Sequence, residues 1–377
     1  MGAHAQPTPA PQPAIVLPDP HDAPTWKKWT SELGWQVIAP DIDPHADPDA
    51  RALALSDAVH EAIKANTADA RRIYLGARGD DAALVFYTIS RVPDLWAAGL
   101  ALGGSPKPAL ASGLVFAANF TNTPVFWVSG APGDSDVASR LKAAGLNIEW
   151  GDAKDISIAK CFEELLRHTR SEHPDTADCE TNTAKFARCF WIEPSKFDGG
   201  ERNEVLPSTR LRDGSGAGLD LGGFGYRLSD SGPGVLISYL PKEYLGPLKI
   251  GDRIVELDGQ TVADARDFDA RLNKVTSEKP VVALIARGKE RVRLDTRIVL
   301  PRADAVVTAR VQGKYDRESR SLHVVSRSIS EMRLTIPPQW APASLYWDGL
   351  ALAPVEKPGC YLLSIDKELL NAAPCPE

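Results

Sequence analysis

The pattern of apolar and polar positions changes twice along the chain. Up to about residue 172, short apolar runs alternate with stretches whose apolar residues recur at helical spacing, such as Leu55 and Val59. Residues 219–302 combine short strand-like runs with one helical stretch, and the chain after residue 303 carries only short strand-like runs between Pro and Gly. The pattern predicts a multidomain protein with an α/β part, an α+β part and an all-β part.

The first part predicts a parallel sheet that helices cover on both faces, because strands and helices alternate regularly. Its expected strands are 14–17, 35–39, 71–79, 96–102, 125–128 and 146–150. Its expected helices begin at about residue 24 and cover 50–64, 80–91, 136–144 and 155–170.

One turn of this part is the most informative segment of the sequence. Residues 71–79 form an apolar strand that enters the turn Gly76-Ala77-Arg78-Gly79-Asp80, and a helix is expected directly afterwards. This is the sequence shape of a nucleophile elbow, in which a sharp turn exposes one side chain above the sheet. Arg78 holds that position, and a guanidinium stays protonated and cannot attack a carbonyl. The sequence therefore predicts the frame of a catalytic site without its nucleophile.

Residues 16–172 resemble the α/β-hydrolase family, in particular its esterase and dienelactone-hydrolase-like members. The resemblance implies a catalytic acid where Asp134 or Asp136 stands, and a histidine where this chain has Lys154. All seven histidines lie outside residues 61–167, and Pro20 lacks the N–H that an oxyanion hole needs. Arg78, Asp134 and Lys154 are then vestigial positions, and we expect no catalytic residue there.

Two roles remain open for Arg78 and Lys154. They can form ion pairs with Asp134, Asp80 or Asp152 and fill the former pocket, or they can hold a small anion beside a helix N-terminus. A third interpretation keeps the hydrolase activity through an unusual set of residues, with Ser105 or Ser129 as nucleophile and Lys154 as base.

The second part carries a more specific motif. Leu248, Gly251, Asp252, Ile254, Asp258 and Gly259 follow the Leu-x-x-Gly-Asp-x-Ile-x-x-x-Asp-Gly pattern, and Gly223-Phe224-Gly225-Tyr226 precedes it. Residues 201–302 thereby resemble a PDZ domain. The resemblance implies that the N–H groups of Phe224, Gly225 and Tyr226 bind the carboxyl terminus of a protein or peptide. It also implies a groove for the peptide's side chains, lined by Leu228, Ala265, Asp269 and Leu272. In the alternative interpretation, another segment of the same chain covers this groove.

The remaining segments predict a β-sandwich into which the PDZ-like part is inserted. Its expected strands are 185–192, 306–315, 321–328, 331–336, 344–347 and 361–365. Residues 344–350 resemble the closing strand of β-domains appended to exported bacterial hydrolases. The expected domains are a flexible segment 1–13, an α/β-hydrolase-like domain 14–172, a β-sandwich of 173–200 and 303–377, and a PDZ-like domain 201–302.

Charge and cysteines narrow the class of protein. The net charge of −7 argues against a nucleic-acid partner, and no apolar run is long enough to span a bilayer. Ala3-His4-Ala5 is typical of the end of a signal peptide, which predicts a periplasmic or extracellular protein. The spacing of the cysteines matches no metal-binding or redox motif. Four of them allow three disulfide pairings, of which we favour Cys179–Cys189 with Cys360–Cys375. The alternative is that these thiols are reduced, in a cytosolic protein.

Together these observations favour an exported interaction protein that is not an enzyme and needs no cofactor: a pseudo-hydrolase with a peptide-binding domain. The alternative from another class is an esterase or peptidase with a non-standard catalytic set. In a third interpretation, all three domains are purely structural and serve only to pack against a partner.

Overall fold

The computed structural model describes residues 10–200, 205–211, 217–226, 230, 232–275, 277–300, 308–366 and 369–376. The chain divides into two compact units, a first unit of Met1–Leu211 with Val306–Glu377 and a second unit of Arg212–Ala305. Among the described residues, no helix combines the length and the apolar composition that crossing a membrane requires.

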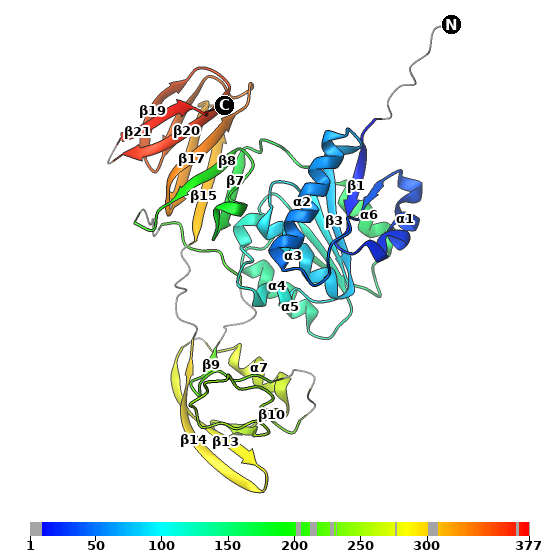
Figure 1. Cartoon of the computed structure of the whole chain (residues 1–377), viewed down its shortest axis with the longest axis vertical. Coiled ribbons are helices and arrows are strands. Elements are labelled where there is room, and N and C mark those ends of the chain that lie inside the picture. The colour runs from blue at the N-terminus through cyan, green and yellow to red at the C-terminus, as the bar shows by residue number, and fades with distance from the viewer. Residues whose placement is uncertain are drawn as a thin grey trace. The chain divides into compact units, whose positions relative to one another are not determined.

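The first unit begins with a six-stranded sheet in which all neighbouring strands run parallel (Figure 1). Its order across the sheet is β2 (Gln36–Ile38), β1 (Gln12–Val16), β3 (Ala68–Arg78), β4 (Ala98–Leu102), β5 (Val125–Ser129) and β6 (Ile148–Asp152). β1 starts at Gln12, inside the segment expected to be flexible. Because the strands are parallel, all their carboxyl ends lie at one edge.

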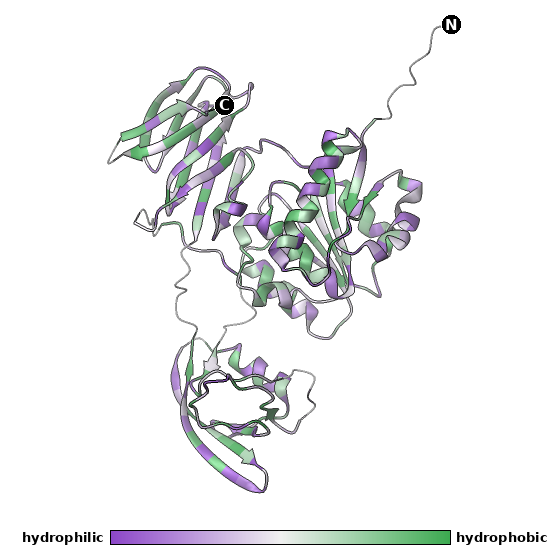
Figure 2. Cartoon of the chain, viewed as in Figure 1, coloured by the Kyte–Doolittle hydropathy of each residue, from purple (hydrophilic) through white to green (hydrophobic). Residues whose placement is uncertain are grey.

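Helices cover both faces of this sheet, as the alternating pattern predicts. One buried cluster joins Trp26 of α1 (Ala23–Thr30) and Phe162 of α6 (Ile158–Leu166) to the sheet. The other cluster packs α2 (Pro48–Lys64), α3 (Ala82–Arg91) and α5 (Asp134–Ala143) on the opposite face. The strands between these layers are largely apolar (Figure 2). The α/β architecture is confirmed. The sequence did not predict the short helix α4 (Lys107–Ala111), and the helix expected over 155–170 is longer than α6.

The second unit has a sheet with its own core. The strand order is β10 (Val235–Leu236), β11 (Arg253–Leu257), β13 (Lys279–Arg287), β14 (Glu290–Val299) and β9 (Gly218–Leu219), with β12 (Gln260–Thr261) paired to β11. The helix α7 (Ala265–Leu272) packs Phe268 into the same buried cluster as Val235, Ile254 and Ile285. Asp264 caps this helix, because its carboxylate accepts a hydrogen bond from the Asp267 N–H.

Two further sheets complete the first unit. One has the order β19 (Leu350–Val355), β18 (Ala343–Trp347), β16 (Ser321–Arg327), β15 (Ala309–Asp316) and β7 (Thr176–Thr181). The other has the order β21 (Leu369–Pro374), β20 (Gly359–Asp366), β17 (Ile329–Ile336) and β8 (Ile192–Phe197). Both contribute to one buried cluster, in which Trp340 and Trp347 are 3% and 0% exposed, so these rings pack the core.

The strand expected over 185–192 is wrong. Residues Ala184–Phe186 form a short 3-10 helix, and β8 begins only at Ile192. The preceding strand β7 was missed, because its residues Thr176–Thr181 are largely polar and their burial comes from pairing with β15. The disulfide Cys179–Cys189 closes the loop between the two strands, and Cys360–Cys375 joins β20 to the end of β21, so both favoured pairings are confirmed.

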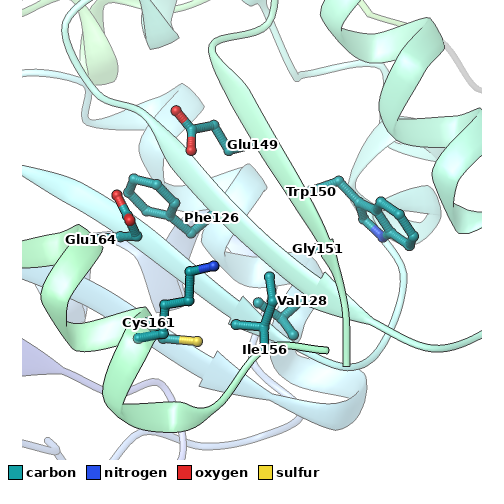
Figure 3. Close-up of a pocket in the computed structure, with 9 residues that line it drawn as sticks. Phe126, Val128, Glu149, Trp150, Gly151, Ile156, Cys161 and Glu164 are labelled. Atoms are coloured by element: carbon teal, nitrogen blue, oxygen red, sulfur yellow. The ribbon is translucent and has the colours of Figure 1, made fainter. Parts of the chain in front are cut away.

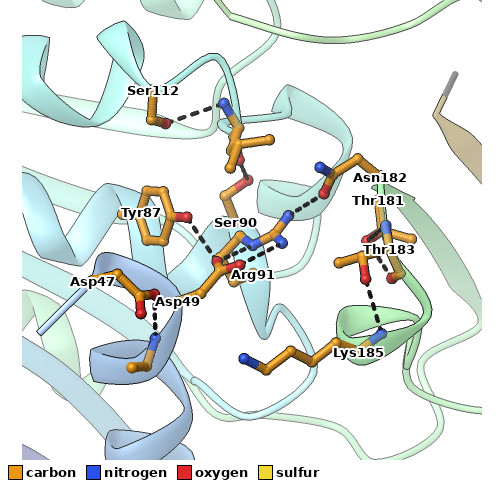
Figure 4. Close-up of polar contacts among 12 residues, drawn as sticks. Asp47, Asp49, Tyr87, Ser90, Arg91, Ser112, Thr181, Asn182, Thr183 and Lys185 are labelled. Atoms are coloured by element: carbon orange, nitrogen blue, oxygen red, sulfur yellow. Dashed lines mark hydrogen bonds and ion pairs between the residues drawn. The ribbon is translucent and has the colours of Figure 1, made fainter. Parts of the chain in front are cut away.

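A buried arginine links the parallel-sheet part to the segment around β7 (Figure 4). The Arg91 side chain is 1% exposed, donates to both Asp49 carboxylate oxygens and to the Asn182 side chain, and lies 4.2 Å from the Phe186 ring centroid. Tyr87 donates to the same Asp49 carboxylate over 2.7 Å. These contacts hold the two parts together within the first unit.

Candidate functional site

The carboxyl edge of the parallel sheet is where chemistry is expected in an open α/β sheet. β3 lies between β1 and β4, so the segments that follow Val16, Arg78 and Leu102 are neighbours at this edge. The segments after β5 and β6 carry Asp134 and Lys154. The topology therefore gathers Arg78, Asp134 and Lys154 at one edge.

Arg78 ends β3 in extended conformation, with φ −125° and ψ 157°. The next residue, Gly79, has φ +57°, so the turn falls one residue later than the sequence indicated. The Arg78 guanidinium donates to Asp22 over 2.7 Å and lies 5.8 Å from the Trp29 ring centroid. Arg78 therefore packs along the loop that follows β1, and a glycine holds the crest of the turn.

Lys154 binds a different carboxylate. Its ammonium group lies 2.9 Å from an Asp152 oxygen, and its side chain is 74% exposed. The hydrogen bond to Asp152 raises the pKa of Lys154 above its usual value. An amine that is held in its protonated form is a poor general base, which argues against a Ser–Lys pair that uses Lys154.

The ion pairs also bear on the expected anion site. Arg78 is paired with Asp22, which was not among the partners considered, and Lys154 with Asp152. Each cation is therefore already compensated by a carboxylate of the chain, and the geometry lends the anion site no support.

Asp134 is the first residue of α5 and is 7% exposed, whereas Asp136 is exposed. Its Oδ2 atom is buried, and within the described part of the chain it has no hydrogen-bond partner. A buried carboxylate oxygen without a partner costs free energy, so such groups often mark functional sites.

A carboxylate–histidine pair lies at the same edge and was missed from the sequence. After β1, Asp19 accepts hydrogen bonds from the His21 backbone N–H and from its ring Nδ1, both over 2.9 Å. The backbone hydrogen bond from His21 lowers the pKa of Asp19. The His21 side chain is 93% exposed and its Nδ1 lies against the Asp19 carboxylate, the contact that acid–histidine pairs of hydrolases use. The Asp-x-His spacing was the signal that could have identified it.

The turn after β4 brings a serine to this edge. Gly103 and Gly104 have φ +70° and +62°, and Ser105 follows them before α4. A Cβ atom on Gly104 would lie 2.0 Å from the Gly79 carbonyl oxygen, so the two turns are in contact. The strand, tight turn, serine and helix repeat the elbow arrangement one strand further along the sheet.

A pocket of about 180 Å³ opens between α6 and the last two strands (Figure 3). Phe126, Val128 and Ile156 make its apolar surface, and the Cys161 thiol lies among them. Burial raises the pKa of Cys161, so little thiolate is present at neutral pH. Cys161 is thus unsuited as a nucleophile.

The glycine-rich loop of the second unit uses one of its expected donors internally. The Gly225 N–H donates to the Tyr239 carbonyl over 2.8 Å and is therefore engaged. Gly222, with φ +79°, precedes Gly223 and Phe224, whose ring lies 6.2 Å from that of Tyr226.

The expected groove residues lie on α7 and beside it. Tyr226 donates to Asp269 over 3.4 Å, and burial raises the pKa of Tyr226 to about 12. Ala265 and Leu272 are 0% and 4% exposed. Leu228 lies outside the described residues. The structure therefore brings the loop next to the helix through Tyr226 and Asp269.

No group of three or more His, Cys, Asp or Glu side chains suited to a metal ion exists within the described ranges.

Comparison with known proteins gives similarity of structure only. No protein-family model and no curated protein sequence matches the chain. A thermostable esterase matches with a TM-score of 0.33 and 14% identity over 45% of this chain and 57% of its own, so the match spans little more than half of that protein. A bacterial heroin esterase matches with a TM-score of 0.31 and 13% identity, over 43% of this chain and 75% of that protein. The S-formylglutathione hydrolase of Staphylococcus aureus matches with a TM-score of 0.30 and 11% identity, over 42% of this chain and 83% of that protein.

These neighbours correct one expectation. The interpretation that the protein is not an enzyme is contradicted: the neighbours are named as esterases and hydrolases. That interpretation depended on Arg78 at the turn, on Lys154 where a histidine is expected, and on histidines lying outside residues 61–167. The carboxyl edge also carries Ser105, which the hydrolase alternative had considered, and the Asp19–His21 pair, which had not been considered.

Proposed function

We propose that the protein is an exported hydrolase that cleaves esters with a non-standard catalytic set at the carboxyl edge of the parallel sheet. The observation that carries the proposal is the hydrogen bond between Asp19 and the His21 ring beside the turn at Gly79. The two disulfides indicate an oxidising environment and so support export to the periplasm or beyond.

In this mechanism Ser105 is the nucleophile. Its hydroxyl attacks the ester carbonyl and passes its proton to Nε2 of His21, while Asp19 stabilises the imidazolium. The imidazolium protonates the leaving alcohol, and water, deprotonated by the same ring, then releases the acid from Ser105.

The distance between the two loops sets a condition on this mechanism. β1 and β4 are two strand spacings apart, roughly 10 Å. The loop after β1 reaches Arg78 through Asp22, and the turn after β4 touches Gly79. Catalytic hydrogen bonds commonly tighten only when the substrate is bound, so the loops must approach each other over this turn.

Hydrolysis of p-nitrophenyl butyrate and labelling by a fluorophosphonate, located by peptide mass spectrometry, test the proposal. Ser105→Ala should abolish labelling and lower the rate by at least about a hundredfold, and His21→Ala should act similarly. His45→Ala is the matched control, because His45 donates its backbone N–H to Asp43 in the same kind of turn after β2. Labelling of another residue, or rates that the Ser105 and His21 variants leave unchanged, would refute this site.

The second unit favours a second candidate function, the recognition of peptide carboxyl termini by a PDZ-like domain. It is supported by Asp252, which is 1% exposed and binds the Lys249 N–H and the Arg287 guanidinium, and so fixes the turn expected from the motif. The glycine-rich loop lies beside α7 through the Tyr226–Asp269 contact. With the Gly225 N–H engaged, Phe224 and Tyr226 remain the proposed donors to the carboxylate.

A library of peptides with free carboxyl termini, screened against the full chain, tests this candidate. We expect enrichment of apolar residues at the terminus and two positions before it, since Ala265 is small. The same peptides with amidated termini should lose binding, because the carboxylate is the group recognised. Equal binding of both forms would exclude this mode of recognition.

A further inference from the structure

A second pocket lies on the helical layer of the first unit, between the α1 region and α6, with a volume of about 340 Å³. This size is within the range of small-molecule sites. It is lined by Trp29, Glu32, Leu33, Ile158, Ala159, Phe162, Glu163 and Leu166.

Its apolar surface is unusual for this part of the chain. Leu33 and Leu166 are 40% and 44% exposed, and within the described residues 10–172 no other large aliphatic or aromatic side chain is as exposed. Both face the same pocket. Exposed apolar side chains that gather at one pocket are typical of a binding site.

The aromatic floor is fixed by its neighbours. The Phe162 ring meets Trp26 and Trp35 edge-on at 6.2 Å and 5.4 Å, and the Trp29 ring meets Trp26 at 5.2 Å. Because these rings already pack against buried side chains, a ligand binds without ordering them first.

Two carboxylates give the pocket its charge. Glu32 and Glu163 are exposed, and no hydrogen bond or ion pair of their side chains occurs in the described part of the chain. Arg167, one turn after Glu163, instead donates to Glu164 over 2.9 Å. The Arg78 guanidinium near Trp29 is neutralised by Asp22. The pocket therefore combines an apolar interior with two carboxylates that form no ion pair among the described residues.

We propose that this pocket binds a small organic cation with an apolar body. The body packs on Phe162, Leu33 and Leu166, and the ammonium group lies beside Glu32 and Glu163. Charge complementarity selects a cation, and the aromatic rings favour an alkylated ammonium group. The site is independent of Ser105 and His21, so it does not rest on the proposed hydrolase activity.

Isothermal titration of the full chain with benzyltrimethylammonium tests the proposal. Neopentylbenzene has the same shape without the charge, and phenylacetate carries the opposite charge. We expect the cation to bind most tightly and phenylacetate not at all. Equal affinity for the cation and the neutral molecule, or no binding of the cation, would overturn the proposal.

Variants locate the binding. Glu32→Gln and Glu163→Gln should each weaken the cation roughly two- to fivefold, and the double variant about tenfold. Leu166→Lys should abolish binding, and it should leave folding intact because Leu166 is exposed. Glu61→Gln on α2, outside the pocket, is the matched control. Undiminished binding by the double variant and by Leu166→Lys, each with an unchanged melting temperature, would place the cation elsewhere and refute the site.

Discussion

Glu180 is a fully buried carboxylate that holds several segments of the first unit together. It accepts hydrogen bonds from Ser208, Thr308 and both the backbone and the hydroxyl of Thr209, and it pairs with Arg327 at 3.0 Å. Asn119 binds its backbone N–H and carbonyl. Ser208 and Thr308 lie close to the points where the chain leaves and re-enters the first unit, so this one side chain fixes both.

We expect Glu180→Gln to lower the free energy of unfolding of the first unit by about 2–4 kcal/mol, because Arg327 would lose its charged partner in a buried site. Urea unfolding followed by tryptophan fluorescence measures the change. Glu193→Gln is the matched control: Glu193 is half-exposed and lies 3.7 Å from Arg333, so its loss should cost less than about 0.5 kcal/mol. A Glu180 variant as stable as this control would contradict the anchoring role.

Asp252 makes the second unit sensitive to acid. The hydrogen bonds from Arg287 hold the pKa of this carboxyl below its ordinary value of 3.8, and the Lys249 N–H adds to the effect. Because the folded pKa is depressed, the stabilisation is complete above about pH 4 and is lost as the pH falls through the folded pKa.

Asp252→Asn should therefore destabilise the second unit at pH 7, by about 2 kcal/mol, and make its stability less dependent on pH below 4. Calorimetry of the full chain between pH 7 and pH 2.5 measures both effects. Asp258→Asn serves as control, since Asp258 is 51% exposed and pairs with the equally exposed Lys279. An unchanged acid dependence in the Asp252 variant would show that another group causes it.

Among the elements, the turn between β4 and α4 depends on close backbone approach. Gly104 and Gly113 both have positive φ, +62° and +67°. A Cβ on Gly104 would meet the Gly79 carbonyl oxygen, whereas one on Gly113 would meet nothing within 4 Å. Both glycines need a positive φ, but only at Gly104 do other atoms occupy the place of a Cβ.

Gly113→Ala should cost about 1 kcal/mol, the ordinary penalty of a left-handed alanine. Gly104→Ala should cost several kcal/mol, because the turns at Gly79 and Gly104 must separate. Thermal unfolding followed by tryptophan fluorescence compares the two. Equal losses would mean that the turns are not packed as closely as described.

The elements that the sequence predicted well are those whose periodicity reflects burial. The strand 125–128 and the helix 50–64 correspond closely to β5 and α2, because apolar residues mark their buried positions. β7 escaped prediction because Asp178 and Glu180 are polar residues whose partners, Arg310 and Arg327, lie far along the chain.

On the scale of the whole molecule, the two units have separate cores, and their unfolding can be followed by different measurements. All nine tryptophans and both disulfides belong to the first unit. Tryptophan fluorescence therefore follows the first unit alone, while calorimetry records both units.

Reduction of the disulfides should lower the melting temperature of the first unit by several degrees, because the unfolded chain regains the entropy that two closed loops removed. The second unit should melt unchanged in the same calorimetric scan. Cys161→Ser, which removes the thiol that is not in a disulfide, controls for effects of the reductant on a free cysteine. A parallel shift of both transitions would show that the units unfold together.

The sequence by itself determined the α/β architecture, and it favoured the two cysteine pairs that the structure joins. These depend on local periodicity and on residue identity, which the chain order preserves. Only the tertiary structure brought Asp22 to Arg78, Asp19 and His21 to the edge beside Gly79, and Leu33 to Leu166. Such arrangements arise when parallel strands align their carboxyl ends and helices pack on a common sheet, which brings together segments that are distant along the chain.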